Sequence, residues 1–206
     1  MKKIFIYLAS QSPRRSQILQ GLGVEFETVI SRYDEKTSVC GKERPSRLVQ
    51  RHAAGKALMA QIPGSKKLEN SLILGADTIV YFRGRILGKP ASYREAERTL
   101  LEMTGKSHWV YTGLVLLDPM SGKVYSGFEK TRVHFHRWGK EKIRSYVRYA
   151  QVLDKAGSYA IQCEPCIVKR ISGSKTNVIG LPEPLLKELI RKARGRSRRV
   201  RVPKTR

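Results

Sequence analysis

The sequence has few cysteines and no long apolar run. Its 206 residues include three cysteines, an odd number that does not make a disulfide framework and that favours a reducing compartment. The apolar run Ile4–Ala9 follows two lysines, as in a signal peptide, but it is shorter than the usual core of about 7–15 residues. No segment approaches the roughly 20 apolar residues that a membrane-spanning helix needs. These absences predict a cytoplasmic protein with no membrane partner.

Acidic residues are also scarce. The chain has 17 Asp and Glu against 41 Lys and Arg, and its formal net charge is +24. A positive field of this size concentrates anions, so nucleotides, nucleic acids and acidic membrane surfaces are the partners to consider. Nine basic residues and no acidic one lie between Arg191 and Arg206. We expect a single domain over residues 1–194, followed over residues 195–206 by a disordered basic tail that can contact nucleic acid weakly.

Hydrophobic periodicity and turn residues predict an α/β protein. Continuous apolar runs are typical of strands that are buried on both faces. Proline or a capping box marks the start of three helices. The predicted strands are residues 3–9, 72–80, 86–87, 108–117 and 123–135, and the predicted helices begin at Pro13 and Pro45, lie between Ser92 and Gly105, or span residues 139–149 and 182–194. This order predicts a mixed sheet that is flanked by helices.

The segment Leu8–Arg15 lies where the first predicted strand meets the first predicted helix. A helix N-terminus presents free backbone N–H groups and the positive end of the helix dipole, which attract phosphate oxygens. Ser10 adds a hydroxyl there. Arg14 and Arg15 add guanidinium groups that match the geometry of phosphate. The alternative is an ordinary helix, capped by Ser12, with surface arginines.

Two acidic positions are candidates for metal binding and catalysis. Asp77 interrupts an otherwise apolar strand, where a carboxylate is costly to bury unless it is paired, bound to a metal or held in a cleft. It can coordinate a metal or activate water at the carboxyl end of a strand, where open α/β sheets place their sites, or it can be a structural residue that bonds to the backbone. Glu35 follows Asp34 in a loop and can complete a carboxylate set for a divalent metal, Mg²⁺ or Mn²⁺. The alternative is a solvated acidic pair.

Two lysines and a glutamine complete the candidate residues. Lys56 lies on the inward stripe of the second predicted helix, and Lys89 lies between Gly88 and Pro90. Each ammonium group can bind a phosphate, or it can belong to a lysine at the edge of the core. Gln162 ends a segment of small residues and offers an amide donor and acceptor that can read a pyrimidine edge.

Two other patterns point to different chemistry. The segment Cys163–Cys166 has zinc-knuckle spacing, and the segment His134–His136 puts two imidazoles on one face of a strand, but no spacing signature links the two. Tyr146 and Tyr149, with neighbouring arginines, are the best candidates for a surface on which bases could stack. A nucleic-acid-binding protein without catalysis is therefore the alternative to an enzyme.

Five segments resemble those of Maf proteins, the septum-formation inhibitor family, and occur in the order that is typical of it. They are Leu-Ala-Ser-x-Ser-Pro-Arg-Arg from Leu8, Gly-Ala-Asp-Thr from Gly75, Leu-Gly-Lys-Pro from Leu87, Asp-Lys-Ala-Gly-Ser-Tyr-x-Ile-Gln from Asp154 and Asn-Val-Ile-Gly-Leu-Pro from Asn177. The resemblance covers about residues 8–182. It implies a nucleoside triphosphate pyrophosphatase with a two-lobed α/β fold, similar to inosine triphosphatase, and an active-site cleft between the lobes.

The resemblance also implies roles for individual residues. Asp77 would be the proton acceptor, and Glu35 would be its carboxylate partner and a second ligand of the divalent metal. The implied phosphate ligands are Ser10, Arg14, Arg15, Lys56 and Lys89. The positions that match those associated with substrate choice are Arg14, Thr78 and Gln162.

The segment around Gln162 resembles the branch of the family that prefers dTTP and UTP, rather than the branch that acts on 7-methyl-GTP. Two residues depart from the family pattern. Cys163 stands where a glycine is usual, and Gly55 lies beside Lys56 in its helix. A homodimer is compatible with the resemblance.

Overall fold

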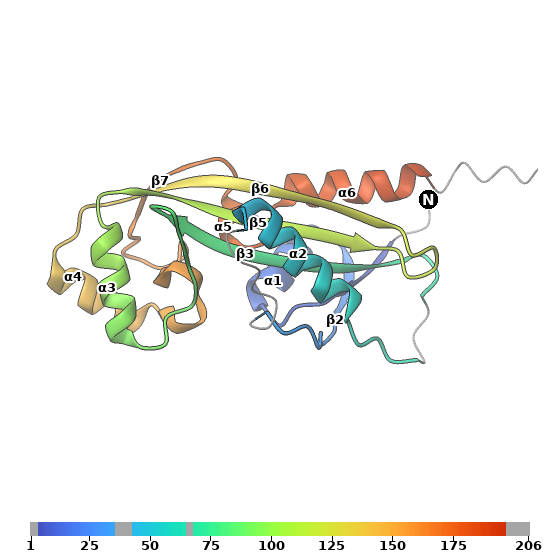
Figure 1. The fold of residues 1–206 in the computed structure, drawn as a ribbon, viewed down its shortest axis with the longest axis horizontal. Helices are drawn as coiled ribbons and strands as arrows, with labels where there is room; N and C mark the ends of the chain where they lie inside the picture. The colour runs from blue at the N-terminus through green and yellow to red at the C-terminus, as the bar shows by residue number, and fades with distance from the viewer. Residues whose placement is uncertain (1–3, 36–42, 65–67, 197–206) are drawn as a thin grey trace, which may run out of the picture.

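The computed structural model describes residues 4–35, 43–64 and 68–196. Within them, seven strands form one sheet in the order β2–β1–β3–β5–β6–β7, and β4 pairs with β3 off this path (Figure 1). The strands are β1 (Phe5–Leu8), β2 (Glu25–Thr28), β3 (Ser71–Phe82), β4 (Arg85–Leu87), β5 (Ser107–Leu117), β6 (Val124–Phe135) and β7 (Val168–Ser172). The helices are α1 (Pro13–Gly21), α2 (Pro45–Leu58), α3 (Tyr93–Met103), α4 (Lys140–Tyr149), α5 (Lys175–Ile179) and α6 (Glu183–Arg196), with short 3₁₀ helices η1 (Val152–Asp154) and η2 (Ala156–Ser158).

The sheet has a parallel part and an antiparallel part. β1 lies parallel to β2 on one side and to β3 on the other, whereas the pairs β3–β5, β5–β6 and β6–β7 are antiparallel. The long strands β3, β5 and β6 extend from the part that carries α1, α2 and α6 to the part that carries α3 and α4 (Figure 1). The predicted mixed α/β fold is therefore confirmed, and the shared strands connect its two lobes.

Three hydrophobic clusters stabilise the lobes. On one face of β1 and β3, Leu74 packs with Leu19 of α1 and Leu186 of α6. On the opposite face, Ile73 packs with Ala53 of α2. Successive side chains of a strand point to opposite faces, so α2 covers the reverse side of the strands that α1 and α6 cover. The third cluster joins the far ends of β3, β5 and β6 to α3 and α4.

Helix α2 lies close to the sheet because two strand residues beneath it have no side chain. A Cβ on Gly75 of β3 would lie 2.0 Å from the carbonyl oxygen of Ala53, and one on Gly113 of β5 would lie 2.4 Å from the backbone of Val49. A larger residue at either position would push the helix away from the sheet. The close packing brings side chains of α2 within reach of Asp77, which points to the same face as Gly75.

The starts of the helices agree with the predictions, with differences in capping. The Ser92 hydroxyl accepts a hydrogen bond from the Glu95 amide at 3.2 Å, so the predicted cap of α3 is confirmed. The Glu95 carboxylate accepts from the Ala91 amide at 2.7 Å, one residue before the N-cap amide that a capping box uses. Helices α1 and α2 each begin at the predicted proline. Ser12 occupies the N-cap position of α1, but its side chain makes no capping hydrogen bond. The start of α1 thus has no side-chain cap.

The last helix extends further than the sequence pattern indicated. α6 ends at Arg196, so the first two residues of the predicted tail are helical. Residues 197–206 lie outside the described part of the chain, and their disorder stays a prediction. Among the described helices, none combines the length and the apolar character that crossing a membrane requires.

Candidate active site

Asp77 lies in the middle of β3, just beyond the point where β1 ends. The parallel pairing of β1 with β3 ends at Leu8 and Leu74, while β3 continues to Phe82. Asp77 lies inside its strand, as predicted, because β3 continues beyond it in antiparallel pairing with β5 as far as Tyr81. It also lies beyond the carboxyl end of the neighbouring parallel strand, where open α/β sheets place their sites.

A lysine from α2 joins two carboxylates at this position. The Lys56 Nζ atom lies 2.7 Å from Asp77 Oδ1 and 2.6 Å from Glu35 Oε1, and it also donates to the Ala76 carbonyl at 3.3 Å. The Asp77 side chain is 6% exposed and that of Glu35 is 52% exposed. The predicted inward position of Lys56 is thus confirmed. Its ammonium group neutralises part of the charge that would make a buried aspartate costly.

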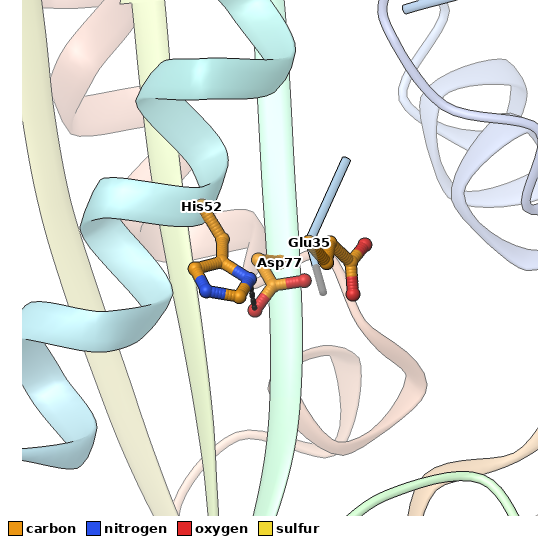
Figure 2. Close-up of side chains that lie close together, drawn as sticks. All are labelled: Glu35, His52 and Asp77. Carbon is orange, nitrogen blue, oxygen red and sulfur yellow. Dashed lines mark ion pairs between the residues drawn. The ribbon is translucent and has the colours of Figure 1, made fainter. Parts of the chain in front are cut away.

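His52, one helical turn before Lys56 on α2, also faces Asp77. Its Nδ1 atom lies 3.8 Å from Asp77 Oδ2, and its side chain is 9% exposed. Figure 2 shows the imidazole beside the aspartate, with Glu35 on the other side of it. Sequence reasoning missed this residue. The signal was present, because residues four apart on a helix share a face, and the inward position of Lys56 implies the same for His52.

Glu35, His52 and Asp77 form a set of groups that fits a divalent metal ion. Each offers one ligand atom, and these atoms all lie within 4.8 Å of one another. Opposite ligands of an octahedral ion with bonds of about 2.1 Å are about 4.2 Å apart, so the three groups need only small movements to share one ion. Oδ2 of Asp77 and both ring nitrogens of His52 are buried without a hydrogen-bond partner, which is a further indication that the residues suit a cation.

On the opposite face of β3, Arg15 joins separate segments of the chain. Its Nε donates to the Gly180 carbonyl at 2.9 Å, its Nη1 to Ser10 Oγ at 2.9 Å and its Nη2 to Thr78 Oγ1 at 3.2 Å. Burial lowers the pKa of Arg15, while the two nearby carboxylates raise it, and a guanidinium stays charged in proteins. Arg15 therefore positions Ser10 and Thr78, and phosphate binding by any of the three stays a prediction.

Arg14 connects the two lobes. Its Nη1 atom lies 2.8 Å from Oδ2 of Asp154, a residue of η1. Burial opposes ionisation of the Asp154 carboxyl, but hydrogen bonds from Lys155 and Arg14 outweigh it and lower the pKa. The Arg14 side chain is 28% exposed, so the guanidinium keeps access to solvent. This ion pair brings the start of α1 next to the segment that leads to Gln162.

Lys89 and Gln162 belong to neighbouring segments of the second lobe. The Gly157 amide donates to the Gly88 carbonyl at 3.1 Å, which holds the segment before Lys89 against the segment before Gln162. Both side chains are exposed. They are placed where a ligand can reach them, and their roles in phosphate binding and base selection stay predictions.

Two other patterns in the sequence do not form sites. Cys163 and Cys166 are free thiols, and His134 bonds to Ser107 at 3.0 Å. Within the described residues, the metal-ligating group is that of Asp77, with no cysteine in it. Tyr146 is buried in the core with its hydroxyl bonded to the backbone of residue 160. The stacking surface predicted on α4 is therefore wrong, because one of its two aromatic rings faces the core.

Comparison with known proteins identifies the family of this chain. The family model described as Maf-like protein matches residues 5–193. A dTTP/UTP pyrophosphatase of Pelotomaculum thermopropionicum is 40% identical over 188 residues, which cover 91% of this chain and 95% of the relative. A dTTP/UTP pyrophosphatase of Methanosarcina barkeri is 40% identical over 91% of this chain and 93% of the relative. A nucleoside triphosphate pyrophosphatase of Synechococcus sp. (strain JA-2-3B'a(2-13)) is 39% identical, with coverages of 90% and 92%. This chain belongs to the Maf-like protein family.

Proposed function

We propose that this protein hydrolyses nucleoside triphosphates, with dTTP and UTP preferred, to the monophosphate and pyrophosphate. The observation that carries the proposal is the Asp77 carboxylate, which is buried in a strand yet held by Lys56 at the carboxyl end of β1. The family membership and the names of the relatives support the same reaction. Free thiols at Cys163 and Cys166 support a reducing, cytoplasmic location.

The triphosphate would lie between the start of α1 and the second lobe. At the start of α1 the Ser10 hydroxyl and the Arg14 guanidinium offer donors for phosphate oxygens. Lys89 would approach the same phosphates from the second lobe. These cations and donors orient the α-phosphorus for attack and stabilise the negative charge of the departing pyrophosphate.

Asp77 would accept the proton of the attacking water. The water oxygen forms a bond to the α-phosphorus, the bond from that phosphorus to the bridging α–β oxygen breaks, and pyrophosphate leaves. Lys56 holds Oδ1 of the carboxylate at 2.7 Å, which fixes the orientation of the side chain. Glu35 and Asp77 would hold the divalent cation, Mg²⁺ or Mn²⁺, which when bound supplies charge neutralisation for the triphosphate.

Gln162 would select the base. Its amide N–H can donate to a pyrimidine carbonyl while its oxygen accepts from N3–H, a pattern that uracil and thymine share. Cytosine presents an unprotonated N3 and an amino group, which leave the same amide mismatched. A pocket of this kind discriminates strongly, because the wrong base leaves polar groups without partners.

The test is a panel of nucleoside triphosphates, including 7-methyl-GTP, assayed for pyrophosphate and monophosphate with and without Mg²⁺ or Mn²⁺. We expect dTTP and UTP to be converted with the highest kcat/KM and only when the metal is present. Release of inorganic phosphate without pyrophosphate would contradict the reaction. A preference for 7-methyl-GTP would contradict the assigned substrate while the reaction itself stands.

Nucleic-acid binding remains a second candidate function, on a surface other than the one predicted. On one face of β5 and β6, Lys130 and Arg132 lie over the Trp109 ring at 5.2 and 6.0 Å, and Tyr111 stacks on Phe128 with centroids 6.4 Å apart. Phe128 is exposed, and Trp109 and Tyr111 are half-buried; aromatic rings among cations are typical of surfaces that bind single strands. Fluorescence anisotropy with a labelled single-stranded oligonucleotide, at two salt concentrations, tests this. Undiminished binding by a Trp109→Ala variant would place the interaction elsewhere.

A further inference from the structure

Four buried polar atoms near Asp77 have no hydrogen-bond partner. They are Oδ2 of Asp77, both ring nitrogens of His52 and the hydroxyl of Tyr33. In the part of the chain that the structure describes, the other such side-chain atoms number two, on His108 and Asn177. Most buried polar atoms are paired, since an unpaired one costs about 1–3 kcal/mol. Their concentration at one place indicates that these groups serve a bound ligand.

The spacing of His52 and Asp77 suits a shared cation better than a direct contact. The 3.8 Å between His52 Nδ1 and Asp77 Oδ2 is too long for a hydrogen bond. Two ligands at right angles on an ion with bonds of about 2.1 Å lie about 3.0 Å apart, and two opposite ligands lie about 4.2 Å apart. The observed separation falls between these limits. An ion between the two side chains can therefore contact both, and the ligand atom of Glu35 is within the same 4.8 Å limit.

The ring of Tyr33 packs against the imidazole ring of His52 and holds it in this orientation. Tyr33 packs edge-to-face against it, with ring centroids 5.7 Å apart and an interplanar angle of 71°. The Tyr33 ring fits there because residue 55 is a glycine, whose Cβ would otherwise lie 2.2 Å from Tyr33 Cε2. Gly55 thus has a packing reason to depart from the family pattern. The departure and His52 belong to one arrangement.

We propose that His52 Nδ1 is a third protein ligand of the divalent cation at Asp77 and Glu35, and that this chain prefers a transition-metal ion to Mg²⁺. The inference rests on the proposed function, which includes the cation but leaves its identity open. Asp77 can contact Lys56 and the cation at the same time, because its Oδ1 accepts a hydrogen bond from Lys56 while its Oδ2 faces His52.

The nitrogen ligand changes which metal the site prefers. Mg²⁺ takes oxygen ligands, demands near-ideal octahedral geometry and releases its waters reluctantly. Imidazole suits the later first-row metals, and the affinity of a given site rises from Mn²⁺ to Co²⁺. Two carboxylates and one imidazole should therefore bind Co²⁺ more tightly than Mn²⁺, and Mn²⁺ more tightly than Mg²⁺. Without the imidazole, the two carboxylates would produce a smaller difference between the affinities for Co²⁺ and Mg²⁺.

Calorimetric titration of the full chain with CoCl₂, MnCl₂ or MgCl₂, in the absence of nucleotide, tests the proposal. We expect the wild type to bind Co²⁺ at least about tenfold more tightly than Mg²⁺. His52→Leu, which keeps an apolar contact for Tyr33, should weaken Co²⁺ binding about tenfold or more and Mg²⁺ binding by less than about twofold. His52→Asn, which offers an oxygen in place of nitrogen, should reduce the preference for Co²⁺ over Mg²⁺.

The control variant is His136→Leu, which removes an exposed histidine that is not part of the metal-ligating group and should leave both affinities unchanged. Equal losses for Co²⁺ and Mg²⁺ in the His52 variants, or no loss for Co²⁺, would overturn the proposal. If His52→Leu does not fold, His52→Asn carries the comparison. Pyrophosphate release by the wild type is measured separately. Metal binding that depends on His52 without pyrophosphate release would contradict the proposed function and leave the ligand assignment intact.

Discussion

The substitution Asp77→Asn separates the catalytic role of this carboxylate from its structural one. The amide has nearly the same shape but cannot accept the proton of the attacking water. Because general-base catalysis contributes about 10²–10⁴-fold, kcat should fall by a factor in that range. The hydrogen bond from Lys56 to the oxygen at the Oδ1 position can persist in the variant, since an amide oxygen also accepts.

The cost in stability follows from the partners that Lys56 keeps. Removing one charge of a fully buried ion pair typically costs about 3–5 kcal/mol, because the other charge is left uncompensated. Lys56 retains Glu35 at 2.6 Å and the Ala76 carbonyl at 3.3 Å, and its side chain is 14% exposed. We therefore expect a loss of about 1–2 kcal/mol in the free energy of unfolding, well below the value for an isolated pair.

The assays are steady-state pyrophosphate release with UTP and urea unfolding followed by circular dichroism. The matched control is Asp118→Asn, the same chemical change at the turn between β5 and β6, where the carboxylate bonds to residues 120 and 121. This control should keep its full kcat. A loss of less than tenfold in Asp77→Asn would remove the residue from the central catalytic role. An unfolding cost of 3 kcal/mol or more would show that Glu35 does not compensate Lys56.

Four further predictions concern packing, pH, specificity and the tail. Gly55→Ala should lower stability by about 1–3 kcal/mol, because its Cβ would overlap the Tyr33 ring. The same change in a Tyr33→Ala background should instead stabilise the helix by about 0.5–1 kcal/mol in urea unfolding, and a loss there would contradict the clash. Burial lowers the pKa of His108 from 6.5 to about 3, so the unfolded chain binds the proton first and stability falls as the pH drops below about 6.5. Between pH 6.5 and 5 this loss should be about 1.6 kcal/mol and absent in His108→Leu, as measured by unfolding at each pH. Gln162→Ala should reduce the ratio of kcat/KM for UTP over CTP about tenfold or more with little change in KM for the triphosphate, and an unchanged ratio would move base selection elsewhere. Deleting residues 197–206 removes five basic residues; kcat should stay the same while the salt dependence of oligonucleotide binding becomes shallower, and a collapse of turnover would place the tail in the active site.

The sequence alone predicted most of the fold because its signals are local. The prolines at the starts of α1 and α2, the cap of α3 and the apolar runs of the strands act within a few residues, so each element could be recognised without its neighbours. The mixed sheet followed from the order of these elements. The parallel pairing of β1 with β3, which places Asp77 just beyond the end of β1, did not, since it depends on contacts between strands that are distant in the chain.

The sequence also predicted part of the candidate site. Ordered motifs predicted which residue types carry the chemistry, and the inward face of α2 predicted the direction of Lys56. Their partners required the tertiary structure. Arg15 proved to bind three other segments of the chain, and Tyr146 proved to be buried. Neither could be read locally, because burial of a residue on an amphipathic helix depends on which elements pack against it.

The sequence by itself determined the family, the order of helices and strands, and the carboxylate, guanidinium and ammonium groups that the proposed reaction uses. Only the tertiary structure decided that His52 lies 3.8 Å from Asp77 and that Tyr33 holds its ring. The physical reason is the close approach of α2 to the sheet, which depends on two glycines on separate strands. Gly75 and Gly113 become neighbours of the helix only when β3 and β5 pair. The ligands of the proposed metal site are therefore brought together by contacts between segments that are distant in the sequence.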